Sequence, residues 1–399
     1  MSLNNTPSAN RLHIGIFGKR NAGKSSIINA ITNQNLAIVS DVKGTTTDPV
    51  LKAMELLPLG PVVIIDTPGL DDEGELGMLR IQKAYQILNK TDIAVLVVDS
   101  SIGMTEEDEI ILEIIKAKKI PYVIVMNKMD LLTGMDLEEI ASSDNTIFVS
   151  TVTNTNIHEL KELIAKHAPK ENNSKKIVAD LLSPMDFVIL VIPIDSAAPK
   201  GRLILPQQQT IRDILDAGAV AIAVKDTELS ETLASLGKKP KLVITDSQVF
   251  HKVSADVPAD IPLTSFSILF ARYKGNLETV VKGARALDTL ENGDTVLISE
   301  GCTHHRQCED IGTVKIPKLL KKHTGKELNF EFTSGTEFPM DLSKYKVIIH
   351  CGGCTLNERE MKYRLKCAED AEVPITNYGI ALAHMNGILE RSVEMFPGL

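Results

Sequence analysis

The sequence GKRNAGKS, residues 18–25, decides the fold class of this chain. It fits the pattern G-x-x-x-x-G-K-S/T, and it stands between the apolar run HIGIF (13–17) and the helix-like run SSIINAI (25–31). In such a phosphate-binding loop, or P-loop, glycines let successive backbone N–H groups curl around phosphates. Lys24 then supplies a positive charge to the β- and γ-phosphates, and Ser25 offers a hydroxyl to magnesium. The segment therefore predicts a nucleotide-binding α/β domain.

Two elements downstream of the P-loop complete a phosphate and magnesium site. DTPG directly follows the apolar run PVVII, so Asp66 can reach the magnesium shell and the Gly69 N–H can sense a γ-phosphate. Between the P-loop and DTPG lies GTTTD (44–48), which can present a switch threonine to magnesium. We favour Thr46 for this role, with Thr45 next.

A third element predicts which base is bound. NKMD (127–130) follows the apolar run PYVIVM, and its Asp130 can accept two hydrogen bonds from the N1 and N2 edge of guanine. Such charge-assisted bonds are worth about 1.5 to 3 kcal/mol each. Adenine offers no matching pair of donors, so we expect GTP. VST (149–151) ends another strand where a base-contacting loop is expected, although Thr151 replaces the alanine common in GTPases.

These motifs give a set of predicted nucleotide-site residues. Lys24 and Thr46 are the expected catalytic residues, to which the resemblance given in the next paragraph adds Asn21, and Ser25 and Thr46 are the expected magnesium ligands. The full set is Gly18, Asn21, Ala22, Gly23, Lys24, Ser25, Ser26, Thr45, Thr46, Asp66, Gly69, Asn127, Lys128, Asp130, Ser150 and Thr151.

The chemistry of hydrolysis needs a device other than the Ras-like glutamine, because Leu70 follows DTPG. Asn21 and the G-T-T-x-D switch resemble those of potassium-activated GTPases of the TrmE and Era group. That resemblance implies that Asn21 helps to hold a K⁺ ion against the phosphates in place of an arginine finger. Asp71, Asp72 and Glu73 are candidates for orienting water. The alternative is that Asn21 only braces the loop and the acidic residues form a solvated switch.

Composition limits the function classes open to the chain. With 399 residues, 43 basic and 52 acidic, the net charge is −9, which opposes nonspecific binding to nucleic acid. The apolar runs are of strand length, well short of the roughly 18 to 20 residues that span a bilayer, and the N-terminus has no secretory pattern. Five cysteines point to reduced thiols or metal ligands. We expect a cytoplasmic protein without membrane or nucleic-acid partners.

The pattern of apolar runs predicts an α/β protein of three domains. Residues 1–170 form the P-loop GTPase domain with a mostly parallel sheet. Residues 171–263 form a second α/β module, without a triad, a metal spacing or a P-loop, and residues 264–399 form a third. One long helix is expected over 265–290, at the start of the third module.

The third module carries a cysteine and histidine pattern. One residue separates Cys302 from His304, and His350, Cys351 and Cys354 follow about fifty residues later. Each group begins where a predicted strand ends. Ligands bind at that edge of open α/β sheets, so two groups remote in sequence can meet in one crevice.

Spacing alone leaves the metal open. Zinc prefers four tetrahedral ligands, and Cys302, Cys308, Cys351 and Cys354 could supply a closed structural site. A four-iron four-sulfur cluster held by three cysteines would instead leave one iron exchangeable. The two glycines between Cys351 and Cys354 would let backbone N–H groups approach the sulfurs of such a cluster.

The combination of C-x-H, a gap of about fifty residues and H-C-x-x-C after a GTPase domain resembles the FeFe-hydrogenase maturation GTPases over essentially the whole chain. The resemblance implies a cluster on Cys302, Cys351 and Cys354, with Cys308 outside the ligand set. Its fourth iron site is labile, and the residues that could line it are His304, His350, Glu309 and Asp310.

The resemblance also implies a biological role. The chain would be a scaffold or carrier that works with two radical-SAM maturases, receives or assembles a diiron precursor, and delivers it to the apo FeFe-hydrogenase. It would form a homodimer through the middle domain. Two alternatives from other classes are a GTPase with a structural zinc module in ribosome or RNA-related assembly, and a redox enzyme whose cluster only transfers electrons.

Overall fold

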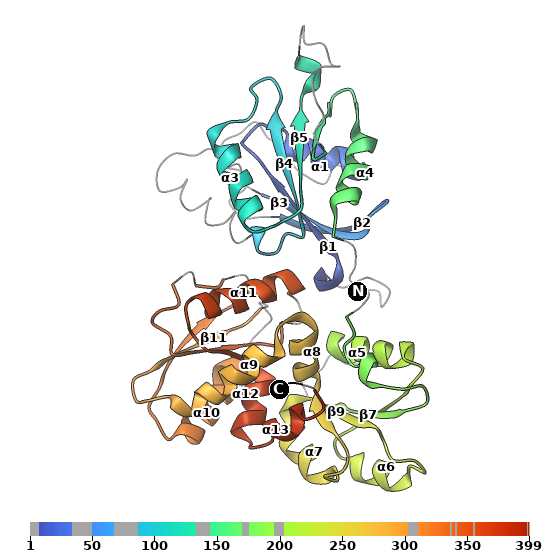
Figure 1. Ribbon diagram of the computed structural model, residues 1–399, viewed down its shortest axis with the longest axis vertical. Helices are drawn as coiled ribbons and strands as arrows, with labels where there is room; N and C mark the ends of the chain where they lie inside the picture. Colours follow the sequence, from blue (N-terminus) through green and yellow to red (C-terminus); the bar gives the residue numbers. More distant parts are fainter. Residues whose placement is uncertain are drawn as a thin grey trace. The chain divides into compact units, whose positions relative to one another are not determined.

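Helices and parallel strands alternate along the chain in the computed structural model (Figure 1). The residues described by the structure are 8–33, 50–67, 87–132, 144–169, 175–194, 203–301, 310–335, 337–339, 341–353, 356–396 and 398. They fall into two compact units, residues 1–171 and 172–399. Within these described ranges, no helix is both long enough and apolar enough to cross a membrane. The predicted α/β class is confirmed.

The first unit is built on a six-stranded sheet with the order β2-β3-β1-β4-β5-β6, in which only the β2–β3 pair is antiparallel. Its strands are β1 (Leu12–Phe17), β2 (Val50–Leu56), β3 (Gly60–Asp66), β4 (Ile93–Asp99), β5 (Tyr122–Asn127) and β6 (Thr146–Phe148). Its helices are α1 (Lys24–Thr32), α3 (Glu106–Ala117) and α4 (Ile157–His167), with short 3-10 turns η1 (Ser8–Asn10) and η2 (Met129–Leu131).

Helices cover both faces of this sheet. Ile27 of α1 and Leu160 of α4 pack in one core, whereas Ile111 and Ile115 of α3 pack in a second core on the other face. Figure 1 shows α3 on one side of β4 and β5 and α1 and α4 on the other. Because β4 is covered on both faces, its sequence IAVLVVD is apolar along nearly its whole length rather than alternating.

The second unit contains two four-stranded sheets, β10-β9-β7-β8 and β12-β11-β13-β14, whose pairs are all parallel. The strands are β7 (Phe187–Val191), β8 (Val220–Val224), β9 (Leu242–Thr245), β10 (Leu263–Ser265), β11 (Thr295–Ser299), β12 (Asn329–Thr333), β13 (Val347–His350) and β14 (Ile375–Asn377). The α-helices are α5 (Leu205–Asp216), α6 (Leu229–Ser235), α7 (Phe250–Asp256), α8 (Phe266–Lys274), α9 (Leu277–Arg285), α10 (Ile316–Thr324), α11 (Glu358–Asp370), α12 (Tyr378–Met385) and α13 (Leu389–Val393). The shorter turns are η3 (Ala179–Leu181), η4 (Ser247–Val249), η5 (Ala286–Thr289) and a π-helical turn, η6 (Ile311–Lys315).

Strand order places a switch point at the predicted cysteine site. From β11 the chain continues to β12 on one side, and it later returns to β13 on the other side of β11. In register, Ser299 at the end of β11 lies beside His350 at the end of β13. Ligands of open α/β sheets bind where the strand order reverses in this way. The two strand ends that were expected to meet are therefore neighbours.

The single helix predicted over 265–290 was wrong. The chain instead forms β10, then α8, then α9 and η5. Ser265 caps α8 by accepting the Ile268 N–H at 3.3 Å, and Asn276 begins α9 by accepting the Thr279 N–H at 3.2 Å. Gly275 lies between the two helices, where the amphipathic pattern continues but the caps divide it. The predicted domain boundaries at 170/171 and 263/264 stay predictions.

Candidate functional sites

The P-loop follows β1 and leads into α1 with three residues in the left-handed backbone region: Gly18 (φ 138°), Asn21 (φ 62°) and Gly23 (φ 97°). A Cβ on Gly18 would lie 2.2 Å from the Val97 carbonyl oxygen, and one on Gly23 would lie 2.1 Å from Nδ2 of Asn127. Both positions therefore require glycine, and the loop curls as phosphate binding demands.

Lys24 lies at the centre of this loop. Its buried ammonium donates hydrogen bonds to the carbonyl oxygens of Gly18 at 2.8 Å and Lys19 at 2.7 Å. These bonds hold the positive charge against the curled backbone. Phosphate oxygens are the ligands for which such a cradle is suited.

Asp66 ends β3, the strand beside β1. Burial raises the pKa of its carboxyl group, and the nearby charges of Lys24 and Lys52 only partly oppose that effect. A buried carboxylate beside a phosphate cradle suits a divalent cation, which would restore its charged form. The predicted residues Thr45, Thr46, Gly69, Asp71, Asp72 and Glu73 lie outside the described residues.

Asn21 is exposed at the rim of the P-loop. No hydrogen bond from its side chain to another described residue is formed, so within those parts of the chain its amide does not brace the loop. Its left-handed backbone is one that asparagine tolerates better than most residues.

The base-binding elements are joined to one another by side-chain hydrogen bonds. The buried Ser150 hydroxyl donates to Oδ1 of Asp130 at 2.5 Å and accepts the backbone N–H groups of Val152 and Thr153 at 3.3 and 3.2 Å. Ser150 therefore fixes the carboxylate that was predicted to read guanine. Thr151 is half-buried beside it.

Asn127 connects the base-binding motif to the P-loop. Its Nδ2 donates to the Ala22 carbonyl at 3.0 Å, while its buried Oδ1 has no partner among the described residues. A buried acceptor left unpaired costs about 1 to 3 kcal/mol, so this atom fits a site completed by a ligand or water. The neighbouring Lys128 pairs with Asp99 at 2.5 Å.

The predicted metal site begins at Cys351, directly after β13. Its backbone N–H donates to the Ser299 carbonyl at 2.9 Å, and its Sγ lies 3.0 Å from the Gly301 nitrogen and 3.4 Å from the Gly353 nitrogen. Both N–H groups donate to the sulfur. We call the segment between β13 and α11 the cysteine loop. Two backbone donors suit a thiolate or a cluster sulfur better than a neutral thiol.

The donor to Cys351 from the other strand is adjacent to a predicted ligand. Gly301 immediately precedes Cys302, so the chain that bears Cys302 leaves β11 next to the Cys351 sulfur. Cys302, His304, Cys308, Glu309 and Cys354 themselves lie outside the described residues. The donor set around Cys351 fits a bound iron–sulfur cluster.

His350 is held by hydrogen bonds on both ring nitrogens. Nη1 of Arg364 lies 2.9 Å from its Nε2, and its Nδ1 lies 2.6 Å from the Cys351 carbonyl oxygen. Arginine can only donate, so Nε2 accepts and Nδ1 carries the proton. The buried ring is therefore hydrogen-bonded at both nitrogens, an arrangement that orients the cysteine loop and occupies the atoms that could bind a metal.

Arg364 itself is fully buried on α11. Besides His350 it donates to Glu360 Oε1 at 2.9 Å, the Gly335 carbonyl at 2.8 Å and the Ser299 hydroxyl at 3.2 Å. One buried guanidinium thus ties the end of β11, the end of β13 and α11 together.

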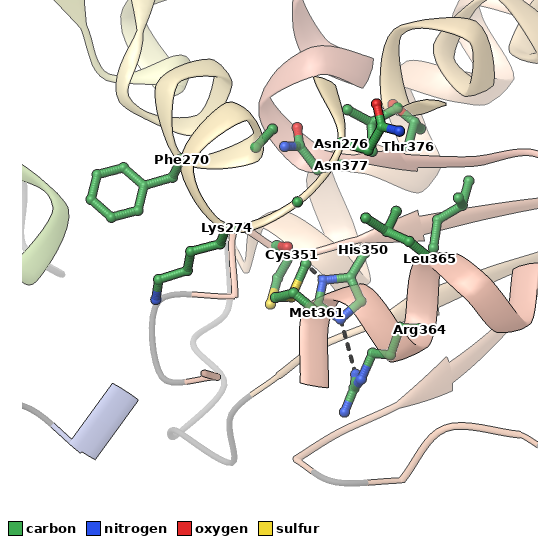
Figure 2. A pocket seen from close by; sticks show the side chains of 15 residues that line it. Phe270, Lys274, Asn276, His350, Cys351, Met361, Arg364, Leu365, Thr376 and Asn377 are labelled. Carbon is green, nitrogen blue, oxygen red and sulfur yellow. Dashed lines mark hydrogen bonds between the residues drawn. The ribbon is translucent and has the colours of Figure 1, made fainter. Parts of the chain in front are cut away.

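A pocket lies beside Cys351, between α8, α11 and the ends of β13 and β14 (Figure 2). The side chain of Lys274, the last residue of α8, reaches toward the cysteine loop from this pocket. Its buried ammonium donates to the carbonyls of Gly353 at 3.3 Å and Leu356 at 3.1 Å. Lys274 therefore places a buried positive charge near Cys351 that would offset the negative charge of a thiolate, whereas the charge of Arg364 is already balanced by Glu360.

Asp310 has a structural role in the described residues. Its Oδ2 accepts the Thr313 N–H at 2.8 Å and the Thr313 hydroxyl at 2.9 Å, which caps η6. Cys367 is half-buried on α11, as a structural cysteine would be.

Sequence reasoning missed Lys274, Arg364 and Glu300. Glu300 follows β11, is buried, and accepts the Tyr378 hydroxyl at 3.2 Å. Burial, then the charges of Glu300 and Cys351, raise the pKa of Tyr378, so its hydroxyl remains a donor. Only the pairing of Glu360 and Arg364 four residues apart gave a signal, and this spacing is common on helix surfaces.

Comparison with protein families identifies three segments. Residues 177–275 match the hydrogen maturase F dimerization domain, and residues 278–395 match the hydrogen maturase F tetramerization domain. Together they cover more than half of the chain. Residues 13–128 match a family described as 50S ribosome-binding GTPase.

Curated relatives match the GTPase domain. The tRNA modification GTPase MnmE of Thermoanaerobacter sp. (strain X514) is 36% identical over 157 residues, which is 38% of this chain and 34% of that protein. MnmE of Carboxydothermus hydrogenoformans is 42% identical over 120 residues, which is 30% of this chain and 25% of that protein. The chain thus spans about a third or less of the length of these relatives.

Solved structures resemble the chain only weakly. Era of Aquifex aeolicus bound to GDP.AlF4- is 20% identical with a TM-score of 0.36, covering 56% of this chain and 98% of that one. The G domain of the FeoB iron transporter of T. maritima is 23% identical with a TM-score of 0.29, covering 39% of this chain and 98% of that one. Similarity at this level carries no argument about activity.

Proposed function

Because the chain belongs to the hydrogen maturase F family and its GTPase domain is of the TrmE/Era type, we propose that it is a GTP-hydrolysing scaffold or carrier in FeFe-hydrogenase maturation. It binds a four-iron four-sulfur cluster with one exchangeable iron, and it assembles or delivers the diiron precursor of the hydrogenase active site. The observation that carries this proposal is the pair of backbone N–H groups on the Cys351 sulfur at the switch point between β11 and β13.

GTP hydrolysis rests on the P-loop and on the base-binding elements. Lys24 stabilises charge on the phosphates, Ser25 with Thr46 holds Mg²⁺, and Asp130 selects guanine. When bound, Mg²⁺ would neutralise negative charge on the phosphates. Asn21, exposed at the loop rim, contributes to a K⁺ site, so turnover should be higher in potassium than in sodium. Equal turnover in the two salts would contradict the cation role.

The cluster would be held by Cys302, Cys351 and Cys354. With only three thiolates, one iron of such a cluster would carry an exchangeable ligand, which suits a carrier whose cargo must bind and later leave. The buried ammonium of Lys274, which donates to two carbonyls of the cysteine loop, supports an anionic group at this place. Since both nitrogens of His350 are engaged, the remaining candidates for the labile position are His304, Glu309 and Asp310.

The partners follow from the family. The two maturase F domains support self-association, with a homodimer through the middle domain and further assembly through residues 278–395. Two radical-SAM maturases and the apo FeFe-hydrogenase would be the other partners. The GTPase domain would control partner exchange. Equal affinity of the GTP and GDP states for these partners would argue against that control.

The decisive experiment is anaerobic purification followed by metal analysis and EPR spectroscopy. The wild-type chain should contain a four-iron cluster whose EPR signal changes when cyanide or imidazole is added. Cys351→Ala should lose the cluster, whereas Cys367→Ala, the matched control on α11, should retain it. Zinc without iron in the wild-type protein would favour the structural zinc alternative. A cluster indifferent to added ligands would favour electron transfer.

A further inference from the structure

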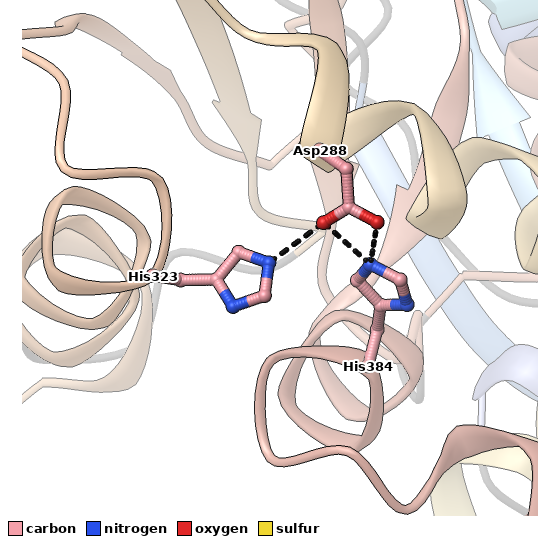
Figure 3. A group of neighbouring side chains, drawn as sticks. All are labelled: Asp288, His323 and His384. Atoms are coloured by element: carbon pink, nitrogen blue, oxygen red, sulfur yellow. Dashed lines mark hydrogen bonds and ion pairs between the residues drawn. The ribbon is translucent and has the colours of Figure 1, made fainter.

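The side chains of Asp288, His323 and His384 point toward one another beside the sheet β12-β11-β13-β14 (Figure 3). Asp288 lies in η5, His323 in the last turn of α10 and His384 in the last turn of α12. Nε2 of His323 lies 2.7 Å from Oδ1 of Asp288, and Nε2 of His384 lies 3.0 Å from each carboxylate oxygen. One ligand atom from each residue lies within 4.8 Å of the others.

This group is separate from the cysteine site. η5 precedes β11 and α10 precedes β12, so Asp288 and His323 belong to the edge where those strands begin. Cys351 and Gly301 follow the ends of β13 and β11 at the opposite edge. A five-residue strand such as β11 separates the two edges by roughly 16 Å.

The electrostatics of this edge favour a cation. The carboxyl ends of α10 and α12 both point their partial negative charge toward the histidines in their last turns, and Asp288 adds a carboxylate. Two of the nearby basic side chains are already paired, Lys321 of α10 with Glu327 and Arg285 at the end of α9 with Glu390, each at 2.9 Å, while Lys322 also lies in the last turn of α10.

We propose that Asp288, His323 and His384 form a binding site for a divalent transition metal ion such as Zn²⁺. Two imidazole nitrogens and a carboxylate oxygen are a ligand set that zinc accepts, with a solvent molecule in the fourth position. Metal–ligand distances of about 2.0 to 2.2 Å place tetrahedral ligand atoms roughly 3.3 Å apart, close to the spacing of the hydrogen-bonded group.

Binding of the ion changes which nitrogen of each histidine carries a proton, and it changes no oxidation state. Each histidine gives up the Nε2–H that it donates to Asp288, and its lone pair binds the ion. Each neutral ring then carries its proton on Nδ1, and a charged ring would release one proton to solvent. The ion would cross-link η5, α10 and α12, which lie far apart in the sequence. The proposal uses none of the residues of the proposed cluster site, and the comparison of wild type with the site variants below is the same whether or not the protein carries a cluster.

The test is equilibrium dialysis of the full-length, cluster-loaded protein against Zn²⁺ under anaerobic conditions, so that the cluster thiolates are occupied. One zinc ion beyond the cluster metal should bind the wild type. His384→Gln and Asp288→Asn should each weaken that binding by at least about tenfold, since each removes a ligand or its charge. His251→Gln, an exposed histidine of α7, is the matched control and should bind as the wild type does.

Two results would overturn the proposal. One is equal zinc affinity in the wild type and both site variants. The other is no zinc bound by the wild type at about 100 µM free metal, which would leave Asp288 as a hydrogen-bond acceptor for two histidines only. Asp288→Asn keeps an oxygen acceptor, and thermal unfolding of each variant without metal identifies any loss caused by misfolding.

Discussion

The P-loop and the cysteine loop are both arranged to bind a negatively charged group, but their charged and hydrogen-bonding residues come from different parts of the chain. Both begin at the end of a central parallel strand, β1 or β13, and both prepare a place for a negatively charged group. In each, a buried lysine donates to two carbonyls of the loop: Lys24 to those of Gly18 and Lys19, and Lys274 to those of Gly353 and Leu356.

The difference lies in where the parts come from. The P-loop carries its glycines and its lysine within eight consecutive residues. The cysteine loop obtains its lysine from α8, its arginine from α11, and a sulfur-binding N–H from the end of β11. A site built from one segment can be recognised in a sequence, whereas the charges of a composite site are visible only after folding.

The strongest test of the composite site is Arg364→Met. Removing one partner of a buried ion pair costs about 3 to 5 kcal/mol, because Glu360 would remain buried without its counterion. Chemical denaturation of the second unit should show a loss of this size. Arg212 forms an exposed ion pair with Asp216 on α5, so Arg212→Met should change the free energy of unfolding by less than about 0.5 kcal/mol. A loss below about 1 kcal/mol for Arg364→Met would mean that this arginine is not what joins the strands.

Lys24→Ala tests the continuous site. Loss of a preorganised positive donor costs about 100- to 1,000-fold in rate, so kcat/KM for GTP should fall by this factor. Steady-state phosphate release measures it. Lys116→Ala on α3 is the control and should hydrolyse GTP at the wild-type rate. If Lys24→Ala hydrolysed GTP at the wild-type rate, Lys24 would not be the residue that stabilises charge on the phosphates.

Lys274→Met tests whether Lys274 stabilises a bound anionic group at the cysteine loop as Lys24 is expected to do in the P-loop. Hydrogen bonds from a charged group contribute about 1.5 to 3 kcal/mol, so iron loss to a chelator should accelerate roughly 10- to 100-fold. The reduction potential of the cluster should also fall, because a nearby positive charge is removed. Lys282→Met, exposed on α9, serves as the control. Unchanged iron release would show that only the P-loop depends on its lysine.

Ser150→Ala should have the smallest effect. The Ser150 hydroxyl orients Asp130 and does not itself carry charge, so GDP affinity should fall about 2- to 10-fold, equivalent to roughly 0.5 to 1.5 kcal/mol. Fluorescent-nucleotide titration can resolve this change. Ser254→Ala on α7 should leave the affinity unchanged. A loss beyond about 100-fold would mean that Ser150 contacts the nucleotide directly.

Features encoded in one continuous segment were predicted from the sequence, whereas features that depend on several segments were not. Apolar runs predicted the parallel sheets, and the strand ends beside Gly18 and Cys351 were placed correctly. The continuous helix over 265–290 failed because local caps at Ser265 and Asn276 outweighed an unbroken amphipathic pattern. Strand β14 has only three residues, too few for a periodic signal.

The break between α8 and α9 lies where two matched segments of the chain meet. Lys274 is the last residue of α8, within the segment matched to the dimerization domain, while the carbonyls it holds belong to the segment matched to the tetramerization domain. Its side chain therefore links the two matched segments by hydrogen bonds. Any displacement of α8, such as a change in how copies of the chain associate, would pull directly on the loop that bears Cys351.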